Sequence, residues 1–398
     1  MPLDGISLAE LAGETGRRER GKIHVAVVGA GLGGTTLAAM LITAGYDVTV
    51  YEQAPALTAL GAGIHLGPNA VKVMRALGLE QALLAIANLP DAWISRDAVT
   101  GEELFRAQFA TDRYGAPYAT VHRGKFHALL TGLVPQENYA LDKRLVAVSE
   151  TGSSLRLAFS DGSHAVADIV AGADGLNSKV RELLMGAERP AYTGIVCYRA
   201  AYPTAALGDL RLDDVAKWWG IGRSVMVYFL NGQRDTVYFV ADVPEAEWRS
   251  ERSFVDGDLN ALRAAFEDCH PDLIRIVGAA PEATKWGMFE RKPLPLWSRG
   301  RIVLLGDACH PMRPHMGQGA AMAMEDGAVL ARCLLSNEPH DFASAFAQYE
   351  ASRRERASAV QVESSLNRWL KAETDPIWVY GYDPIHEPLA SARPRVGG

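Results

Sequence analysis

The sequence lacks the patterns that mark several classes of protein. Its four cysteines are scattered over 398 residues and form no C-x-x-C pair, so we expect neither a disulfide framework nor a zinc or other metal site. No run reaches the length of a membrane span, and the first 21 residues contain no apolar stretch typical of a signal peptide. The sequence therefore predicts a cytoplasmic protein that does not enter the membrane.

Positive charge is also scarce. The formal net charge is −7, and no basic run exceeds GRRERGK, so nucleic acid is not an expected partner. Hydrophobic residues make up 48% of the chain and charged residues 22%, which indicates a globular protein rather than a disordered one. A chain of this length is long enough for a large core and two domains.

Glycines gather directly after the first apolar run. Residues 25–28 are continuously apolar, as a buried parallel strand would be. Gly29, Gly31 and Gly34 then form the pattern G-x-G-x-x-G, and Gly33 adds a fourth glycine. In such a pattern the first glycine permits a tight turn, the second lets a pyrophosphate approach the backbone, and the third lets a helix pack on the strand.

The residues that follow extend this pattern. We expect a helix over residues 32–44, whose free amides and positive dipole end suit a phosphate. A second strand over 46–51 leads to Glu52, whose carboxylate can accept hydrogen bonds from the ribose hydroxyls of an adenosine. The order strand, glycines, helix, strand and acid predicts a dinucleotide fold, with NAD and FAD as alternatives.

Later segments interrupt this fold and then return to it. Strands are expected within residues 93–109, in a β-meander that begins near residue 146, and over most of 195–244, with a hairpin around Asn231 and Gly232. Residues 259–277 have a helical period. The stretch RIVLLGDACHPMRPHMGQGAAMAMED reads as a strand, a loop and a helix, and the chain stays helical to about Trp369.

Three separated motifs carry a family resemblance. GAGLGG with Glu52 is the first, AGADGLNSKVR with Asp174 is the second, and the stretch that contains Asp307 is the third. In this order they resemble the class A flavoprotein aromatic hydroxylases, the single-component FAD monooxygenases of the p-hydroxybenzoate hydroxylase fold. The resemblance covers about residues 22–380.

The resemblance implies an α/β fold with a discontinuous, Rossmann-like FAD-binding domain, an inserted and mainly β substrate domain, and a C-terminal helical segment. The boundaries that we expect are 1–21 for an N-terminal tail, 22–90, 118–190 and 286–340 for the FAD-binding domain, 91–117 and 191–285 for the substrate domain, and 341–398 for the C-terminal segment. Within the tail, ISLAELAG is expected to be a short helix or a loose segment.

The resemblance also implies a function. FAD and NADH are the expected cofactors, a small aromatic ring and molecular oxygen are the substrates, and a C4a-hydroperoxyflavin delivers the hydroxyl group in a monomer or homodimer. EQAPALTALGAGIHLGPNAVKVMRALGLE and DPIWVYGYD are similar to enzymes that hydroxylate 6-hydroxynicotinate to 2,5-dihydroxypyridine with loss of the carboxyl group. A salicylate-type or other phenol hydroxylase is the first alternative function. A flavin reductase or a non-hydroxylating sensor is the second alternative. A halogenase is not favoured, because the sequence contains no W-x-W-x-I-P stretch.

Residues expected to contact FAD come from the first and third motifs and from the segments between them. An arginine at position 123, after a strand, can bind a phosphate or a carbonyl. The amides of residues 319 and 320, at a helix start, can stabilise negative charge on reduced flavin. The full expected set is Gly29, Gly31, Gly33, Gly34, Glu52, Gln53, His65, Arg123, Leu145, Asp307, Gly319 and Ala320.

The resemblance implies that three residues surround the aromatic substrate, namely His65, Tyr228 and His315. His65 follows GAGI, which we take for a flexible glycine-flanked segment, and histidine suits proton transfer because its pKa lies near neutrality. Ser224 and Val215 are expected to border the ring pocket. Both residues differ from those of the 6-hydroxynicotinate enzymes. Those enzymes tend to have a histidine in place of Ser224 and a cysteine near the position of Val215.

Two residues near these motifs have competing interpretations. Asp174 either caps the helix that follows it or contacts both FAD and the nicotinamide cofactor. The sequence does not choose between these two roles. His310, which comes next to Cys309, is expected to order its loop rather than to take part in chemistry.

Overall fold

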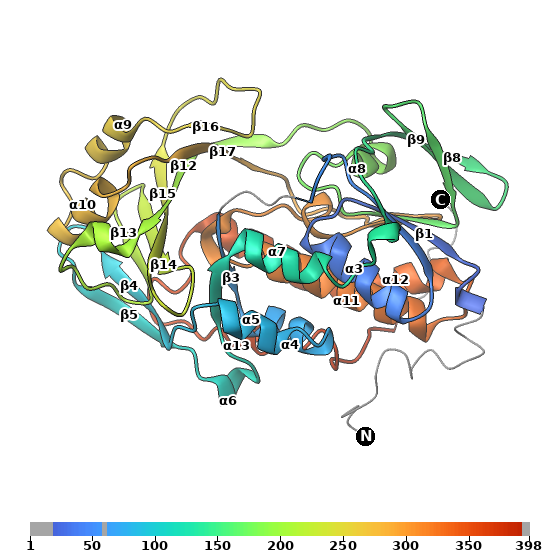
Figure 1. Cartoon of the computed structure of the whole chain (residues 1–398), viewed down its shortest axis with the longest axis horizontal. Coiled ribbons are helices and arrows are strands. Elements are labelled where there is room, and N and C mark those ends of the chain that lie inside the picture. The colour runs from blue at the N-terminus through green and yellow to red at the C-terminus, as the bar shows by residue number, and fades with distance from the viewer. Residues whose placement is uncertain (1–18, 58–61, 392–398) are drawn as a thin grey trace.

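The computed structural model describes residues 19–57 and 62–391 of the chain. Two sheets lie side by side in it, with long helices packed around one of them (Figure 1). The mixed α/β fold with a C-terminal helical segment confirms the predicted fold class. The ISLAELAG stretch lies outside the described residues.

The first sheet has six strands in the order β18-β19-β11-β1-β2-β7. β1 pairs in parallel with β2 on one side and with β11 on the other, as a dinucleotide fold requires. Its strands are β1 (His24–Val28), β2 (Asp47–Tyr51), β7 (Tyr139–Ala140), β11 (Ile169–Gly172), β18 (Ser298–Arg299) and β19 (Ile302–Leu304). The helices α3 (Leu32–Thr43), α11 (Gly319–Ser336) and α12 (Phe342–Leu366) accompany it.

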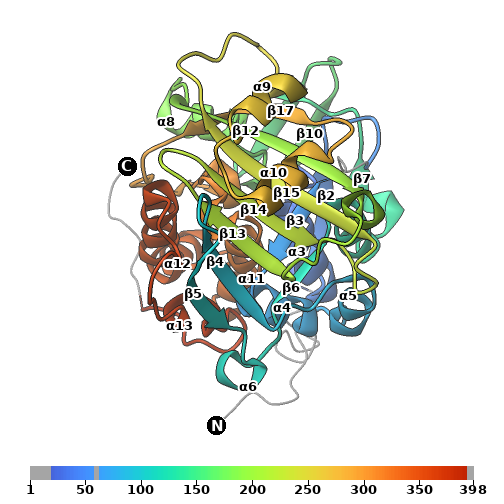
Figure 2. The ribbon, with the colours of Figure 1, turned by 90° about the vertical axis from the view of Figure 1, so that its left-hand side faces the viewer.

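The second sheet has eight strands in the order β16-β17-β12-β15-β14-β13-β4-β5, and Figure 2 shows it in front of the helices. Its strands are β4 (Ala92–Asp97), β5 (Glu103–Gln108), β12 (Ala191–Pro203), β13 (Val215–Trp219), β14 (Ser224–Phe229), β15 (Thr236–Pro244), β16 (Phe254–Asp256) and β17 (Thr284–Glu290). Two short helices, α9 (Leu259–Ala264) and α10 (Pro271–Gly278), share a separate hydrophobic core with one face of this sheet.

The remaining helices and strands lie outside these two sheets. They are β3 (Gly63–Leu66), α4 (Pro68–Ala76), α5 (Glu80–Ile86), α6 (Thr111–Tyr114), β6 (Ala119–His122), α7 (Arg123–Thr131), β8 (Leu145–Thr151), β9 (Ser154–Phe159), β10 (His164–Ala167), α8 (Lys179–Met185) and α13 (Ile377–Tyr380). β8, β9 and β10 form the predicted meander, and β3 pairs with β6.

Several local predictions can be compared with these elements. The predicted hairpin is present, with Tyr228 of β14 opposite Tyr238 of β15. The helical stretch at 259–277 is broken into α9 and α10, because Pro271 begins a new helix. The prediction of a flexible segment around His65 was wrong, since this residue lies in β3 and pairs with Thr120 of β6.

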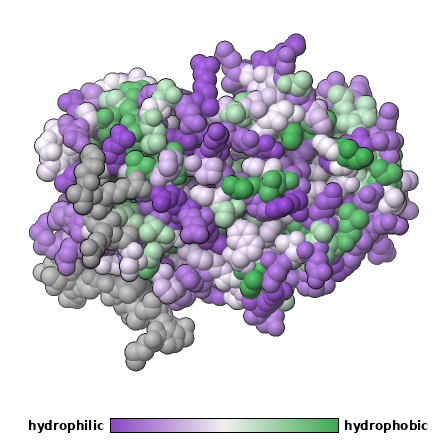
Figure 3. Space-filling model, turned by 180° about the vertical axis from the view of Figure 1, so that it is seen from behind, coloured by the Kyte–Doolittle hydropathy of each residue, from purple (hydrophilic) through white to green (hydrophobic). Residues whose placement is uncertain are grey.

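Each of the two large sheets combines segments that lie far apart in the chain. β4 and β5 join the later strands β12–β17 in the second sheet, while β18 and β19 return to the first. β17 crosses the boundary that we placed between residues 285 and 286. Among the described residues, no helix combines the length and the apolar character needed to cross a membrane. The face shown in Figure 3 is mainly hydrophilic, with small scattered hydrophobic groups.

Candidate active site

The glycine turn after β1 opens the N-terminus of α3 towards a cavity. Gly29 has a φ of 107°, and a side chain there would meet the carbonyl oxygen of Ala173 at 2.4 Å, so only glycine fits. Gly31 precedes the helix, and no atom lies within 4 Å of the place where its side chain would be. Because no side chain caps α3, its first backbone N–H groups can bind a ligand.

The N-terminus of α11 opens on the same cavity. This helix begins at Gly319 and also has no side-chain cap. The predicted cofactor residues that line the cavity are Gly31, Gly33, Gly34, His65, Arg123, Asp307, Gly319 and Ala320. Two uncapped helix N-termini beside an arginine suit the anionic pyrophosphate and the flavin ring of FAD. These residues therefore fit the cofactor that the sequence predicts.

Glu52 lies at the carboxyl end of β2, outside the cavity. Its Oε2 accepts a hydrogen bond from the backbone N–H of Ala30 at 2.8 Å, and its Oε1 accepts one from Ala54 at 2.9 Å. Each carboxylate oxygen has a second lone pair, so Glu52 can still accept from ribose hydroxyls. Gln53 is exposed beside it, and Leu145 is buried at the start of β8.

One face of the second sheet forms the floor of the cavity. The strand register arranges its side chains in three rows that run across β12, β15, β14 and β13, in that order. The first row consists of Ala201, Tyr238, Tyr228 and Val215, and the second consists of Arg199, Val240, Met226 and Lys217. The third row consists of Cys197, Asp242, Ser224 and Trp219. The alternate residues of these strands point into the second core. A flat ring that enters the cavity therefore meets aromatic, apolar, cationic and acidic groups at defined places.

His65 packs against the first row. Its ring centroid lies 4.1 Å from that of Tyr228, and its Nδ1 is 2.9 Å from the Tyr118 hydroxyl. Burial, with a smaller contribution from the charge of Lys217, lowers the pKa of His65 to about 3. The side chain is therefore neutral at physiological pH, which leaves it able to accept a proton but makes it a weak base.

Tyr228 belongs to β14 and is fully surrounded. A side chain at Gly63 would lie 2.6 Å from the Tyr228 hydroxyl, so glycine in β3 is what lets the tyrosine reach the cavity. Burial raises the pKa of Tyr228 well above its usual range, and the nearby Tyr238 adds to this effect. The Tyr228 hydroxyl therefore stays protonated at neutral pH and is able to donate a hydrogen bond to a ligand.

His315 faces the third row from the loop before α11. Its Nδ1 lies 2.8 Å from the carbonyl oxygen of Ser364, and its Nε2 lies 3.2 Å from Oδ2 of Asp242. The hydroxyl of Ser224 donates to the same Oδ2 at 3.0 Å. Burial opposes the ionisation of Asp242, but His315, Lys217 and Ser224 together outweigh it and hold the carboxyl pKa below its usual range.

Sequence reasoning missed three charged residues of the floor: Arg199, Lys217 and Asp242. Each stands at an inward position of an otherwise apolar strand, in VCYRA, VAKWW and FVADV. This exception to the apolar pattern was a usable signal. What the sequence did not provide was the register that places the three side chains on the face shared with Tyr228.

Other predicted residues have different surroundings. Val215 is fully buried next to Tyr228 in the first row and does not line the cavity, whereas Ser224 does. The carboxylate of Asp174 accepts hydrogen bonds from the Ser178 hydroxyl and from the first backbone N–H groups of α8, which favours its role as a cap. The ring of His310 lies 2.5 Å from Oδ2 of Asp326, as expected of a residue that orders its loop.

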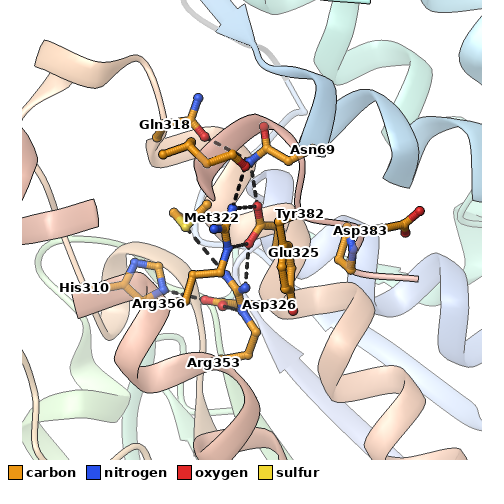
Figure 4. Close-up of polar contacts among 12 residues, drawn as sticks. Asn69, His310, Gln318, Met322, Glu325, Asp326, Arg353, Arg356, Tyr382 and Asp383 are labelled. Carbon is orange, nitrogen blue, oxygen red and sulfur yellow. Dashed lines mark hydrogen bonds and ion pairs between the residues drawn. The ribbon is translucent and has the colours of Figure 1, made fainter. Parts of the chain in front are cut away.

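A buried ion cluster supports α11 behind the cavity (Figure 4). Arg353 of α12 contacts Glu325 at 2.5 Å and Asp326 at 2.9 Å, and all three side chains are fully buried. Asp326 also accepts a hydrogen bond from the backbone N–H of Gly306 at 2.9 Å. The cluster thereby ties the loop of Asp307 to α11 and α12.

The fold and the site together define a class of protein. A dinucleotide fold with two helix N-termini at one cavity, floored by the sheet of a second domain, is the arrangement of an FAD-dependent oxidoreductase that acts on a small ring substrate.

Comparisons with known proteins agree with this class. The model of the family described as "FAD binding domain" matches residues 22–364. The chain is 51% identical to 6-hydroxynicotinate 3-monooxygenase of Bordetella bronchiseptica over 378 residues, which are 94% of this chain and 99% of that protein. It is 48% identical to the enzyme of the same name from Pseudomonas fluorescens over 375 residues, 93% of this chain and 97% of the other.

Among solved structures, Klebsiella pneumoniae HpxO in complex with FAD and uric acid is similar, with a TM-score of 0.78 and 26% identity over 90% of this chain and 91% of that chain. The chain therefore belongs to the FAD-binding family and is a flavin-dependent aromatic monooxygenase of class A.

Proposed function

We propose that the chain hydroxylates a ring acid of the 6-hydroxynicotinate type, with NADH as the reductant and with loss of the carboxyl group to give 2,5-dihydroxypyridine. The observation that carries the proposal is the floor of the cavity, where an arginine without a carboxylate partner faces aromatic and acidic groups. Identity of about half the residues to two proteins named 6-hydroxynicotinate 3-monooxygenase supports it.

The charged residues of the second row provide the acid-binding part of this proposal. Among the described residues, no carboxylate forms an ion pair with Arg199, whose Nε lies 3.5 Å from the sulfur of Cys197. A guanidinium in this position suits a planar carboxylate, which it can bind through two hydrogen bonds. Val240 and Met226 lie beside it and supply an apolar surface for the ring.

The first row provides the proton chemistry. The neutral His65 can accept the proton of the ring hydroxyl, and Tyr228 can hold the oxygen by donating a hydrogen bond. Removal of this proton raises the electron density of the ring carbon that is attacked. Bound FAD would accept two electrons from NADH and activate oxygen for transfer. In the balanced reaction one oxygen atom becomes the new ring hydroxyl, the other leaves as water, and the carboxyl group leaves as carbon dioxide.

The proposal is tested with purified, FAD-loaded protein and a panel of ring acids. We expect NADH oxidation to rise several-fold with 6-hydroxynicotinate, and chromatography to show 2,5-dihydroxypyridine. Salicylate, 4-hydroxybenzoate and nicotinate, which lacks the hydroxyl, serve as comparison compounds. NADH oxidation that no ring compound alters, with hydrogen peroxide as the product, would overturn the proposal in favour of an oxidase or reductase. Product from salicylate alone would favour the phenol hydroxylase.

A further inference from the structure

Asp242 is a buried carboxylate with one oxygen that has no partner. The residue is 5% exposed and lines the cavity from the third row. Its Oδ2 is occupied, because it accepts from the Ser224 hydroxyl and faces Nε2 of His315. Its Oδ1 makes no hydrogen bond with any described residue.

Two side chains lie at Oδ2 and leave Oδ1 open. The Ser224 hydroxyl donates to Oδ2 at 3.0 Å. Nε2 of His315 lies 3.2 Å from the same oxygen, and the contact between its Nδ1 and the carbonyl oxygen of Ser364 holds the ring in place. Oδ1 is therefore the end of the carboxylate that remains for a ligand.

A buried carboxylate oxygen without a donor is costly, so the position calls for a group that donates a hydrogen bond. Cationic groups of the protein do not fill this role. Lys217 donates to Oδ1 of Asn367 at 2.6 Å, and Arg199 stands one row away on β12. Between them lie Val240 and Met226, which give a flat ring an apolar surface in the row next to that of Asp242.

The chemistry of the reaction narrows the donor. A ring hydroxyl that must ionise would be held back by a carboxylate beside it, because two like charges repel each other. A ring N–H or an amino group donates to the carboxylate when the ligand binds and places no second negative charge beside it. By donating to a carboxylate, it also shifts electron density into the ring, which favours attack by an electrophilic oxygen.

We propose that Asp242 is a specificity-determining residue that accepts a hydrogen bond from a nitrogen donor on the ring, so that the cavity selects pyridones and aminophenols over phenols of the same shape. The inference rests on the proposed function in one respect, namely that the ligand is a hydroxylated ring acid.

Three ligands of nearly equal size test the proposal. The pyridone form of 6-hydroxynicotinate carries an N–H where 4-hydroxybenzoate carries a C–H, and 3-amino-4-hydroxybenzoate adds an amino group to the latter. Dissociation constants are measured from the change in the flavin absorbance of FAD-loaded protein, which requires no turnover. Wild-type protein should bind the two nitrogen donors about 10- to 100-fold more tightly than 4-hydroxybenzoate, as a hydrogen bond to a charged group predicts.

Asp242→Ala should reduce this preference to about 3-fold or less, chiefly because it weakens the binding of the two ligands that carry a nitrogen donor. Asp242→Asn keeps a neutral acceptor of the same shape and should retain part of the preference, which also guards against a failure of the alanine variant to fold. Asp256→Ala removes an exposed carboxylate from β16 of the same sheet and should leave the preference unchanged.

The outcomes separate this proposal from the function on which it rests. An equal preference in wild type and in both Asp242 variants would overturn it, and so would a wild type that binds the three rings equally or binds none. If the preference follows Asp242 but no ring is hydroxylated, the proposed function fails and the role of Asp242 stands. If phenols and pyridones are hydroxylated without preference, the function stands and the role of Asp242 fails.

Discussion

Arg199 and Lys217 stand at opposite ends of the second row of the sheet, with two apolar side chains between them. Their surroundings differ. Lys217 donates to Asn367 and lies 4.0 Å from the centroid of the Trp219 ring, so its charge already has partners. Arg199 also lies over an aromatic ring, 4.7 Å from the centroid of Trp286, but within the described part of the chain it has neither an oxygen acceptor nor a carboxylate partner. The two cations therefore divide the cavity into an end that can bind an anion and an end that is already satisfied.

Replacement of Arg199 should weaken the binding of ring acids. For Arg199→Met we expect a dissociation constant for 6-hydroxynicotinate about 10- to 100-fold higher, because a charged hydrogen-bonding pair is lost. The amide of the same acid has no charge to pair, so its binding should change little. Flavin absorbance titrations measure both ligands, and Arg249→Met, at a side chain 87% exposed, is the control. Equal losses for the acid and the amide would show that Arg199 does not bind the carboxylate.

The buried Lys217 should give the stability of the protein a distinct pH dependence. Burial lowers its pKa to about 7, against 10.5 for an exposed lysine, while Asp242 opposes the shift and Lys371 adds to it. Between these two values the unfolded chain binds a proton that the folded chain lacks. The free energy of unfolding therefore gains a contribution that rises with pH over this range, and below pH 7 the cost of the buried charge is fully present.

The matched variant for this effect is Lys217→Met. Compared with the variant, wild-type protein should gain stability as the pH rises from about 7 to 9.5, measured as the difference between their urea midpoints. Lys179→Met, at a partly exposed position of α8, should show no such trend. A constant difference between wild type and Lys217→Met across this range would mean that Lys217 keeps its proton in the folded state.

Glu52 should matter for the retention of FAD. Loss of its hydrogen bonds to the ribose should cost about 1.5–3 kcal/mol of binding, the usual value for bonds to a charged group. Glu52→Ala also frees the amides of Ala30 and Ala54, so Glu52→Gln is needed as the milder variant. Flavin fluorescence during dilution measures the release of FAD, and Glu137→Ala at an exposed position is the control. Extraction of FMN instead of FAD would contradict the assignment.

The buried ion cluster behind α11 should be important for folding. Arg353→Met leaves Glu325 and Asp326 without their buried partner, and loss of one partner in such a pair costs about 3–5 kcal/mol. Arg368→Met breaks the exposed pair with Glu363 and should change stability by about 1 kcal/mol or less. Urea unfolding compares the two. Similar midpoints for both variants would show that Arg356, which also contacts Glu325, compensates for Arg353.

Short-range patterns predicted much of this molecule. The turn from Gly29 to Gly34 and the hairpin of β14 and β15 were predictable, because glycine chemistry and strand alternation act over few residues. The placement of His65 in a strand was not, since β3 is held by β6, more than 50 residues away in the chain. Because glycines lie next to His65 in the sequence, the segment around His65 had the pattern of a loop.

The charged part of the site was harder to predict than its aromatic part. The family resemblance was enough to propose Tyr228 for the site. The relation of Arg199, Lys217 and Asp242 to one another depends on the register of four strands, and a shift of one residue would turn each side chain to the opposite face. That register is fixed by packing against two different cores, which no single stretch of sequence contains.

His65 and Tyr228 should affect turnover more than they affect FAD. Both side chains line the cavity, whereas Glu52 does not, and their ring centroids are 4.1 Å apart. For His65→Asn and Tyr228→Phe we expect turnover to fall by about 10²-fold. This value is the lower end of the range for general base catalysis, and we choose it because a base whose pKa is about 3 takes up a proton less readily. The FAD content of both variants should equal that of two control variants, His386→Asn and Tyr192→Phe. The controls change partly exposed residues outside the cavity.

The double variant decides whether the two side chains act together. If His65 and Tyr228 hold one ring proton as a unit, the double variant should be little slower than the slower single variant, since members of a unit are not additive. Independent roles would instead multiply the two losses. Single-turnover measurement with reduced enzyme, oxygen and substrate isolates the hydroxylation step from the reduction of FAD. An unchanged rate of this step in both single variants, with normal FAD content, would assign the two residues to the packing of the cavity wall rather than to proton transfer.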